Sequence, residues 1–322
     1  MTNPKTENPV ALVALGGHAF MERGQKGTID EHEGNAARIC EELILLVERG
    51  YNLVITHGNG PQVGNLLLQN EACKDDVVPM PLDVLVAQTE GSLGYVLQNA
   101  MLNQLRKRSI KRYVLTVVCQ VQVSQEDPAF DNPTKPIGPF LSKEEALRRA
   151  RDLDWDVVED AGRGWRRRVP SPKPLKIIQR HSIREAAKQG HVVIAGGGGG
   201  IPIAKDRDSG EYKGVEAVID KDYTSALLAN QVGADLFCIL TEVPQVYLNF
   251  GKPDQRPLGA LTVEMVRAQM ADGHFPVGSM GPKIQAIINY LEAGGKRALV
   301  TNPQSLPEAL DGAAGTHFVG RC

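Results

Sequence analysis

Five consecutive glycines, Gly196 to Gly200, follow a short apolar run and are the first residues in this sequence to suggest chemistry. Five adjacent glycines lose much conformational entropy on folding, so the run needs a physical reason. Without Cβ atoms, backbone N–H groups can closely approach an anion, most often a phosphate. A flexible linker or a tight turn is the alternative, although a linker seldom begins where a buried strand ends. We therefore expect Gly197, Gly198 and Gly199 to bind phosphate.

Two further glycine turns follow predicted strands, Gly16-Gly17-His18 and Gly58-Asn59-Gly60. In an open α/β sheet, ligands bind at the carboxyl ends of the strands, so the three turns should converge on one edge. The Walker A pattern GxxxxGK[ST] is absent, and GxGxxG does not open the first strand–helix unit, which disfavours the ordinary P-loop and dinucleotide sites. Together the turns indicate a phosphate carried between bound partners.

Lys221 lies between Asp220 and Asp222 at the predicted start of a helix. Flanking carboxylates pair with a lysine and localise it, which suits an ammonium group that holds a phosphoryl group as a point charge. The alternatives are that the aspartates cap the helix and that the lysine is an exposed surface charge. Both interpretations stay open on these residues alone.

Two other lysines occupy positions that favour a nearby anion. Pro282 at the first helical position puts Lys283 in the first turn, where the helix dipole disfavours a positive charge unless a polyanion binds there. Lys135 lies between Pro133 and Pro136, which stiffen the backbone and would aim its side chain toward the glycine turns. We expect both lysines at the phosphate site.

The elements that must position these residues alternate between strand and helix. The N-terminal part predicts strands at Val10–Leu15, Leu53–Thr56 and Tyr113–Val118, separated by a polar loop over Met21–Glu33, a helix that ends at Gly50, and a long helix over Leu82–Leu105 with a break near Gly91 or Gly94. This order predicts an α/β fold with a parallel sheet and helices on both faces.

The alternation resumes at Ile177 after an irregular segment. From there the sequence predicts, in order, strand Val192–Ala195, helix Asp220–Val232, strand Leu236–Thr241, helices Val263–Ala271 and Pro282–Leu291, and strands Ala298–Thr301 and Thr316–Val319.

The irregular segment, residues 123–173, contains several prolines, a predicted helix over Lys143–Arg151, and a predicted hairpin of Trp155–Glu159 and Trp165–Val169. A hairpin does not belong inside a parallel sheet. We therefore expect residues 123–173 to form a protruding subdomain that acts as a lid, inserted within a single domain of residues 1–322. The run Arg166-Arg167-Arg168 is expected to be a solvated face balanced by acidic neighbours, with phosphate binding as the alternative.

Composition limits the classes of protein. The 322 residues are 42% hydrophobic and 23% charged, which is ordinary globular composition. The net charge of −2 gives no overall basic field for nucleic acid. Five scattered cysteines without CxxC spacing indicate reduced thiols in a cytoplasmic protein with no zinc site. A polar N-terminus and the lack of an apolar run near the roughly 20 residues of a membrane span indicate no signal peptide and no membrane partner.

Several longer motifs resemble those of the carbamate kinases, members of the amino-acid kinase superfamily. They are THGNGPQVG at 56–64, MPLDV at 80–84, NPTKPIGPF at 132–140, EDAGRGWRRRVPSPKP at 159–174, GGGGIP at 197–202, GVEAVIDKD at 214–222, LTEVPQVYLNFGKP at 240–253 and GSMGPK at 278–283. The resemblance implies an open αβα sandwich with a mostly parallel central sheet and a small protruding subdomain. It also implies a homodimer and reversible, Mg²⁺-dependent phosphoryl transfer between ATP and carbamate.

The resemblance further implies roles for single residues. Lys221 and Lys283 would neutralise the phosphoryl group, Asp222 would orient both lysines, and Lys135 would reach the substrate from the subdomain. The first two glycine turns would hold the transferred phosphate and carbamate. Mg²⁺ would be bound mainly through the phosphates of ATP or ADP, with no metal ligands from the protein. The nucleotide side would include Thr241, Tyr247, Met280 and Gly281.

The first turn departs from the family pattern, because it reads Gly-Gly-His-Ala where the family usually has Gly-Gly-Asn-Ala. His18 therefore puts the choice of acceptor in question. The alternatives are a related kinase for another small carboxylate or carbamate-like acceptor, and a non-catalytic nucleotide-binding homologue. The presence of Lys221, Asp222 and Lys283 argues against the second alternative.

Overall fold

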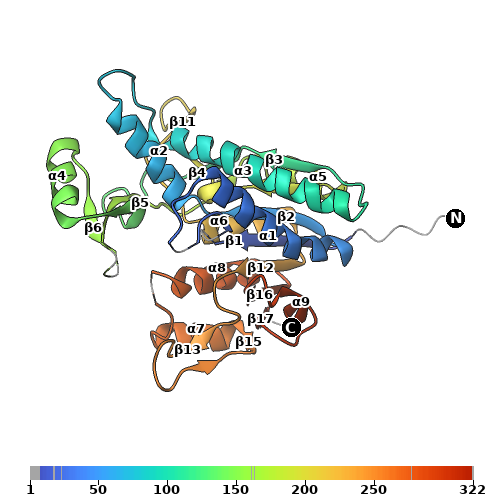
Figure 1. Ribbon diagram of the computed structural model, residues 1–322. Helices are drawn as coiled ribbons and strands as arrows, with labels where there is room; N and C mark the ends of the chain where they lie inside the picture. Colours follow the sequence, from blue (N-terminus) through green and yellow to red (C-terminus); the bar gives the residue numbers. More distant parts are fainter. Residues whose placement is uncertain are drawn as a thin grey trace.

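The computed structural model describes residues 8–16, 19–22, 24–160, 162, 164–276 and 278–320. An eight-stranded sheet runs through the molecule, with α1 and α3 on one side of it and α8 on the other (Figure 1). Its strands, in spatial order, are β15 (Ala260–Thr262), β17 (Thr316–Val319), β16 (Arg297–Thr301), β12 (Leu236–Leu240), β1 (Val10–Leu15), β2 (Asn52–His57), β9 (Val192–Ala195) and β3 (Val114–Val117).

All neighbouring strands of this sheet pair in parallel except β16 and β17, which are antiparallel. Every residue of β1, β2, β9 and β12 is buried, as expected for parallel strands covered on both faces. The predicted α/β fold with a mostly parallel central sheet is therefore confirmed.

Alternate residues of β1 supply the two halves of the core. Ala11, Val13 and Leu15 pack with α1 (Ile29–Glu48), α3 (Leu82–Lys107) and α9 (Leu306–Leu310). Leu12 and Ala14 belong to the cluster on the other face, built with α5 (Arg180–Lys188), α6 (Lys221–Val232), α7 (Val263–Ala271) and α8 (Met280–Glu292). The period-two alternation of the strand thus joins two helical layers through one sheet.

Two sequence expectations about helices were wrong. The polar segment expected to be a loop through Glu33 is helical from Ile29, because Thr28 and Glu31 form a capping box. The long helix α3 has no break at Gly91 or Gly94. Gly94 instead permits close packing on β3, since a Cβ at this position would lie 2.3 Å from Thr116 Cγ2.

The segment between residues 123 and 173 carries its own three-stranded antiparallel sheet, in the order β5-β7-β6, and one helix, α4. It lies at one end of the molecule, to the left in Figure 1, away from the eight-stranded sheet. The hairpin predicted from the two tryptophan-containing runs is present as β6 and β7. The bounds are β5 (Lys135–Leu141), α4 (Lys143–Leu153), β6 (Val157–Glu159) and β7 (Trp165–Val169).

A second small sheet, in the order β11-β10-β4-β8, and a two-stranded ribbon, β13-β14, were not predicted. Their strands are only two to five residues long, and although Gln120–Val123 alternates between polar and apolar residues, it does so over four positions only. The bounds are β4 (Gln120–Val123), β8 (Lys176–Ile177), β10 (Ile201–Lys205), β11 (Tyr212–Gly214), β13 (Tyr247–Leu248) and β14 (Arg256–Pro257).

The subdomain is attached to the body through α2 (Gly60–Ala72). A Cβ added to Gly64 of α2 would lie 1.9 Å from Gly138 Cα of β5, so the two backbones touch. At the other end of α2, Glu71 accepts hydrogen bonds from Trp155 Nε1 at 2.8 Å and from Arg149 Nη1 at 3.1 Å. The subdomain therefore packs on the helix that begins at the second glycine turn.

The arginine run in β7 has the acidic partners that were expected, but it is not the solvated face that was expected. Arg166 pairs with Asp160 at 3.0 Å, with 13% of its side chain exposed, and Arg168 pairs with Asp156. Arg167 stacks on the Trp155 ring, and burial lowers its pKa from the usual value. The strand pleat points the arginines to both faces of a thin sheet, where aspartate and tryptophan side chains cover them.

Candidate active site

Four loops meet along one edge of the central sheet. They follow β12, β1, β2 and β9, which are consecutive neighbours in the sheet and run in the same direction. Gly16, the Gly58-Asn59-Gly60 turn and the glycine run after β9 therefore lie at the same edge, as the sequence predicted. Gly17 and His18 lie outside the described residues.

The glycine run packs tightly against the protein's own chain. Gly196, Gly198, Gly199 and Gly200 have positive φ angles, and Gly197–Gly199 form a single buried turn. A Cβ at Gly199 would lie 2.2 Å from the carbonyl oxygen of Ile219, in the segment that leads into α6. The glycines are thus required to bring this turn against neighbouring segments, so the tight turn that the sequence analysis kept as an alternative is present.

The second glycine turn is held by buried contacts. The Asn59 side chain, 2% exposed, donates a hydrogen bond to Thr89 Oγ1 of α3 at 2.8 Å. A Cβ at Gly198 would lie 2.1 Å from Asn59 Nδ2, so this side chain lies between α3 and the glycine run. Gly60 begins α2, with Asn59 at the N-cap position. Asn59 therefore fixes the relative positions of two loops with its side chain.

One carboxylate joins the two predicted phosphoryl-binding lysines. Asp222 Oδ1 accepts from Lys221 Nζ at 2.5 Å, and Asp222 Oδ2 accepts from Lys283 Nζ at 3.2 Å. The three side chains are 5%, 13% and 18% exposed, respectively. Lys221 and Asp222 open α6, and Lys283 lies in the first turn of α8, so both ammonium groups stand at helix N-termini. Such a cluster provides two closely spaced positive charges beside the sheet edge.

The charges in this cluster stabilise one another. Burial alone would raise the pKa of the Asp222 carboxyl, but the two lysines hold it below its ordinary value. Burial opposes the charge on Lys283, yet the Asp222 carboxylate raises the pKa of that lysine. Burial lowers the pKa of Lys221, and the charge of Lys283 lowers it further. Asp222 is therefore ionised and keeps two mutually repelling cations together.

Lys135 reaches the same place from the subdomain. Its Nζ lies 2.5 Å from Asp220 Oδ2, while Asp220 Oδ1 accepts from the Asp222 N–H at 2.9 Å and caps α6. Asp220 thus has both roles that the sequence left open, as a helix cap and as a partner for a lysine. The four predicted residues Lys135, Lys221, Asp222 and Lys283 lie in one connected network.

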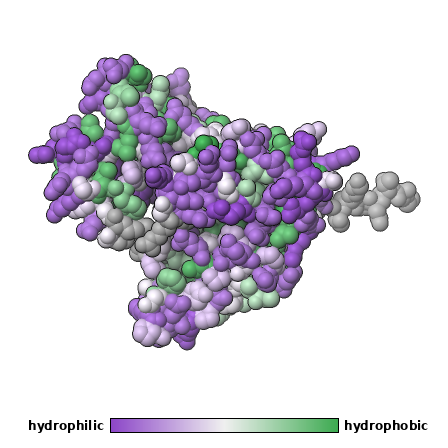
Figure 2. All heavy atoms as spheres, viewed as in Figure 1, coloured by the Kyte–Doolittle hydropathy of each residue, from purple (hydrophilic) through white to green (hydrophobic). Residues whose placement is uncertain are grey.

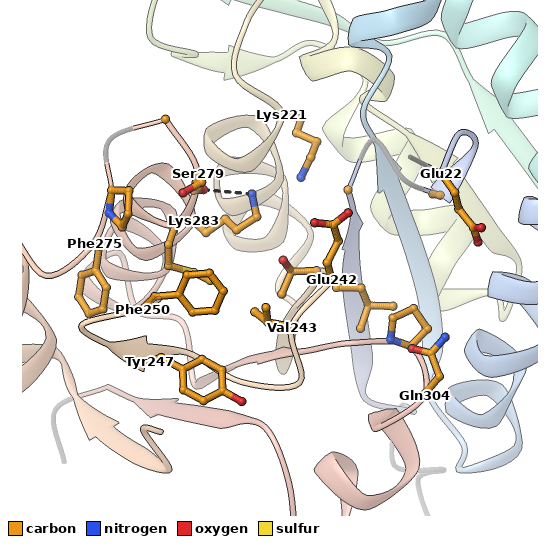
Figure 3. A pocket seen from close by; sticks show the side chains of 18 of the residues that line it. Glu22, Lys221, Glu242, Val243, Tyr247, Phe250, Phe275, Ser279, Lys283 and Gln304 are labelled. Carbon is orange, nitrogen blue, oxygen red and sulfur yellow. Dashed lines mark hydrogen bonds between the residues drawn. The ribbon is translucent and has the colours of Figure 1, made fainter. Parts of the chain in front are cut away.

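A cavity of about 640 Å³ opens beside this network. Figure 3 shows aromatic side chains, Tyr247, Phe250 and Phe275, at one end and the amino groups of Lys221 and Lys283 at the other. The Glu242 carboxylate lies beside the amino groups at the second end, where its charge raises the pKa of Lys283. The cavity therefore has an apolar end suited to a base and a cationic end suited to phosphates.

Three of the four residues expected on the nucleotide side, Thr241, Tyr247 and Met280, line this cavity, together with Gly16. Gly281 does not line it, because it is buried in the first turn of α8, where a Cβ would lie 3.0 Å from the carbonyl oxygen of Pro276. The sequence analysis put Pro282 at the first position of this helix, which is wrong. The helix begins at Met280, so Pro282 is its third residue.

Sequence reasoning missed several lining residues. Phe275 and Gln304 come from loops with no distinctive pattern of their own, and Phe250 and Ser279 lie within motifs noted in the sequence but were not singled out. Glu242 belongs to the motif LTEVPQVYLNFGKP, whose length was the only signal that this loop takes part in the site.

This arrangement has counterparts among known proteins. The sequence model described as "Amino acid kinase family" matches residues 9–302. The chain belongs to the amino acid kinase family.

Within the family, the similarity is to carbamate kinases. The chain is 46% identical to the carbamate kinase of Thermococcus kodakarensis, over 96% of this chain and 98% of the relative. It is also 46% identical to the carbamate kinase of Pyrococcus furiosus, over 96% and 98%. The resemblance inferred from the motifs is therefore confirmed.

Solved structures of carbamate kinases are also similar to this chain over nearly its whole length. A structure titled as carbamate kinase from Giardia lamblia bound to citric acid has a TM-score of 0.92 and 37% identity, covering 98% of this chain and 99% of that one. A second structure of the Giardia lamblia enzyme, bound to AMP-PNP, has a TM-score of 0.89 and 38% identity, covering 98% and 99%. The expected αβα kinase fold is thus the fold of these enzymes.

Proposed function

We propose that this protein is a carbamate kinase that transfers a phosphoryl group between carbamoyl phosphate and ADP. The observation that carries the proposal is the Lys221–Asp222–Lys283 cluster, whose two lysines line the cavity together with Gly16 of the first glycine turn. Identities of 43–46% to curated carbamate kinases over nearly the whole chain support the same activity.

The reaction needs positioning and charge neutralisation. A β-phosphate oxygen of ADP forms a bond to phosphorus while the bond from phosphorus to the carbamate oxygen breaks, and carbamate leaves. Negative charge spreads over the transferred oxygens, and Lys221 and Lys283 are placed to neutralise it. Asp222 keeps these lysines in position and does not touch the phosphoryl group itself.

The acceptor side lies at the glycine turns. Backbone amides of the turns at Gly16 and Gly58–Gly60, with Gly17 and His18 nearby in the sequence, would hold the phosphate and carbamate. The turn Gly197–Gly199 would contribute by packing beside them. Lys135 would leave Asp220 and contact the substrate when it binds.

The nucleotide would fill the cavity, with its base beside Tyr247 and Met280 and its phosphates toward the lysines. Both oxygens of Asp222 are occupied by lysines, and no group of three or more potential metal-ligating side chains occurs within the described residues. We therefore propose that Mg²⁺ is held mainly by the nucleotide phosphates and water, which suits an ion that keeps much of its hydration. When bound, Mg²⁺ would neutralise part of the phosphate charge.

We propose a homodimer formed through β3 and α3. The strand β3 is at the edge of the sheet, where Leu115 within the strand is 37% exposed and Tyr113, immediately before it, is 73% exposed. On α3, Tyr95 and Leu102 are also exposed, at 58% and 42%. Exposed apolar edge strands are rarely left uncovered. Light scattering should give twice the chain mass, and Leu115→Lys should shift it toward the monomer.

We propose a cytoplasmic location, for which the chemistry of the cysteines is the argument. Cys40, Cys73, Cys119 and Cys238 are free thiols. Among the residues that the structure describes, no helix is both long enough and apolar enough to cross a membrane. Cell fractionation, with free thiols counted in the native protein, tests this location.

The decisive assay is ATP formation from ADP and carbamoyl phosphate with Mg²⁺, run beside acetyl phosphate. A carbamate kinase should strongly prefer carbamoyl phosphate. Comparable turnover of acetyl phosphate would favour a kinase for another small carboxylate, and no ATP from either donor would favour a non-catalytic homologue.

A further inference from the structure

Glu90 is a buried acid that the proposed reaction does not use. It lies on α3 with 2% of its surface exposed. Its Oε2 accepts a hydrogen bond from the Cys119 N–H at 2.8 Å, and among the described residues its Oε1 has no hydrogen-bond partner. Buried carboxylates are normally fully paired, so an oxygen left without a partner needs a reason.

The glycine run lies directly against this side chain. A Cβ at Gly197 would lie 3.3 Å from Glu90 Cγ on one side and 2.4 Å from His57 Nε2 on the other. The Gly197 N–H also acts on the Glu90 carboxyl, favouring its charged form, as the Cys119 N–H does. Glu90 is therefore the group that backs the glycine turn from the α3 side.

We propose that Glu90 is a positioning residue that keeps its proton at neutral pH and, as a neutral acid, holds the glycine turn at Gly197 in its binding conformation. The inference rests on the proposed role of this turn at the phosphate site.

The surroundings favour the neutral form. Burial raises the pKa of the Glu90 carboxyl well above its ordinary value. The groups that face it are also uncharged at neutral pH, since burial raises the pKa of the Cys119 thiol and lowers the pKa of His57 to about 4. Among the described residues no lysine or arginine forms an ion pair with Glu90. An ionised Glu90 would add uncompensated negative charge immediately behind a phosphate site.

The test compares Glu90→Gln with Glu90→Ala in the full-length protein. Glutamine keeps the shape and an acceptor without a charge, so we expect KM for carbamoyl phosphate to stay within about twofold of wild type. Alanine leaves the Cys119 N–H unpaired and the glycine turn unsupported, so we expect KM to rise about tenfold or more. Asp235→Ala is the matched control, because Asp235 also accepts from a backbone N–H, that of Val10 at 2.9 Å, at the opposite end of β1.

Two readouts do not depend on activity. Infrared spectra should contain the carbonyl band of a protonated carboxylic acid in wild type, and this band should be absent from Glu90→Gln. Amide hydrogen exchange at Gly197–Gly200 should be faster in Glu90→Ala, and unchanged in Glu90→Gln and Asp235→Ala.

These readouts separate the two proposals. Inactive wild-type protein with the infrared band and the exchange pattern as expected would refute the kinase proposal and leave the role of Glu90 intact. Loss of activity in Glu90→Gln as large as in Glu90→Ala would show that the charge is needed and would overturn the inference. A Glu90→Ala variant with lower thermal stability but unchanged KM and exchange would overturn it as well.

Discussion

Lys135 of the subdomain and Asp220 of the sheet body form an ion pair in which Nζ and Oδ2 lie 2.5 Å apart. Asp220 is the N-cap residue of α6, and Lys221 is the first residue of that helix. The ion pair therefore connects the subdomain to the helix turn that carries Lys221. Through this ion pair the subdomain contacts the site, and we expect Lys135 to exchange Asp220 for the substrate when the substrate binds.

We expect Lys221→Met and Lys283→Met each to lower kcat by roughly a hundredfold or more, because each lysine opposes charge that develops in the transition state. Steady-state kinetics with ADP and carbamoyl phosphate measure the effect. Lys296→Met is the control, since Lys296 pairs with Asp235 away from the site. Near-normal kcat in both site variants would remove these lysines from the mechanism.

The subdomain should behave as a lid. We expect faster amide exchange in the segments that join it to the body, near residues 124–134 and 170–175, than in β1 or β2, and slower exchange there when ADP and carbamoyl phosphate bind. Lys135→Met should accelerate exchange in the same segments without ligand. Lys143→Met, a change within the subdomain where the lysine lies over the Trp165 ring, should not. Equal protection with and without ligand would argue against a lid.

The contact between Gly64 and Gly138 should not tolerate a side chain. Gly64→Ala should destabilise the protein by about 1–3 kcal/mol, since the added Cβ would overlap Gly138 Cα and separate α2 from β5. Gly91→Ala is the matched helical control, because no atom lies within 4 Å of its added Cβ, and it should stabilise α3 by up to about 1 kcal/mol. Urea unfolding of both variants measures the difference, and equal stabilities would contradict it.

His57 should make stability depend on pH. Its ring is 1% exposed, and burial lowers its pKa from 6.5 to about 4. The unfolded chain therefore binds a proton below pH 6.5 before the folded chain does, so stability is lost as pH falls from 6.5 toward 4. The loss amounts to about 3 kcal/mol. Unfolding curves should show a shallower decline over this range in His57→Gln, and parallel declines would refute the assignment.

Much of the fold could be predicted from local patterns. β1, β9, α7 and β17 have the bounds that hydrophobic runs and turn residues indicated. The start of α1 was missed although its signal, Thr28 followed by Glu31, was present in the sequence. The break expected in α3 was wrong because a helical glycine can serve tertiary packing, as Gly94 does against Thr116.

The site was predictable as a set of residues but not as a network. Predicted helix N-termini identified Lys221 and Lys283, and the neighbouring prolines identified Lys135. The sharing of Asp222 by two lysines, and the pairing of Lys135 with Asp220, depend on contacts between segments up to 85 residues apart. The apolar end of the cavity depends likewise on loops brought together only in the folded chain. Figure 2 shows that most of the visible face of the molecule is hydrophilic, with hydrophobic residues in scattered patches.

The shared aspartates have a consequence for the protein before any ligand arrives. Lys135, Lys221 and Lys283 are accompanied by Asp220 and Asp222, and the charge of Glu242 also acts on Lys283, so carboxylates offset the positive charges of the network. Asp220 and Asp222 thus pair with the lysines in the protein without a ligand. Among the described residues, Asp220 is the one of these two aspartates that pairs with a lysine of the subdomain, so we expect an incoming phosphate to replace Asp220 as the partner of Lys135.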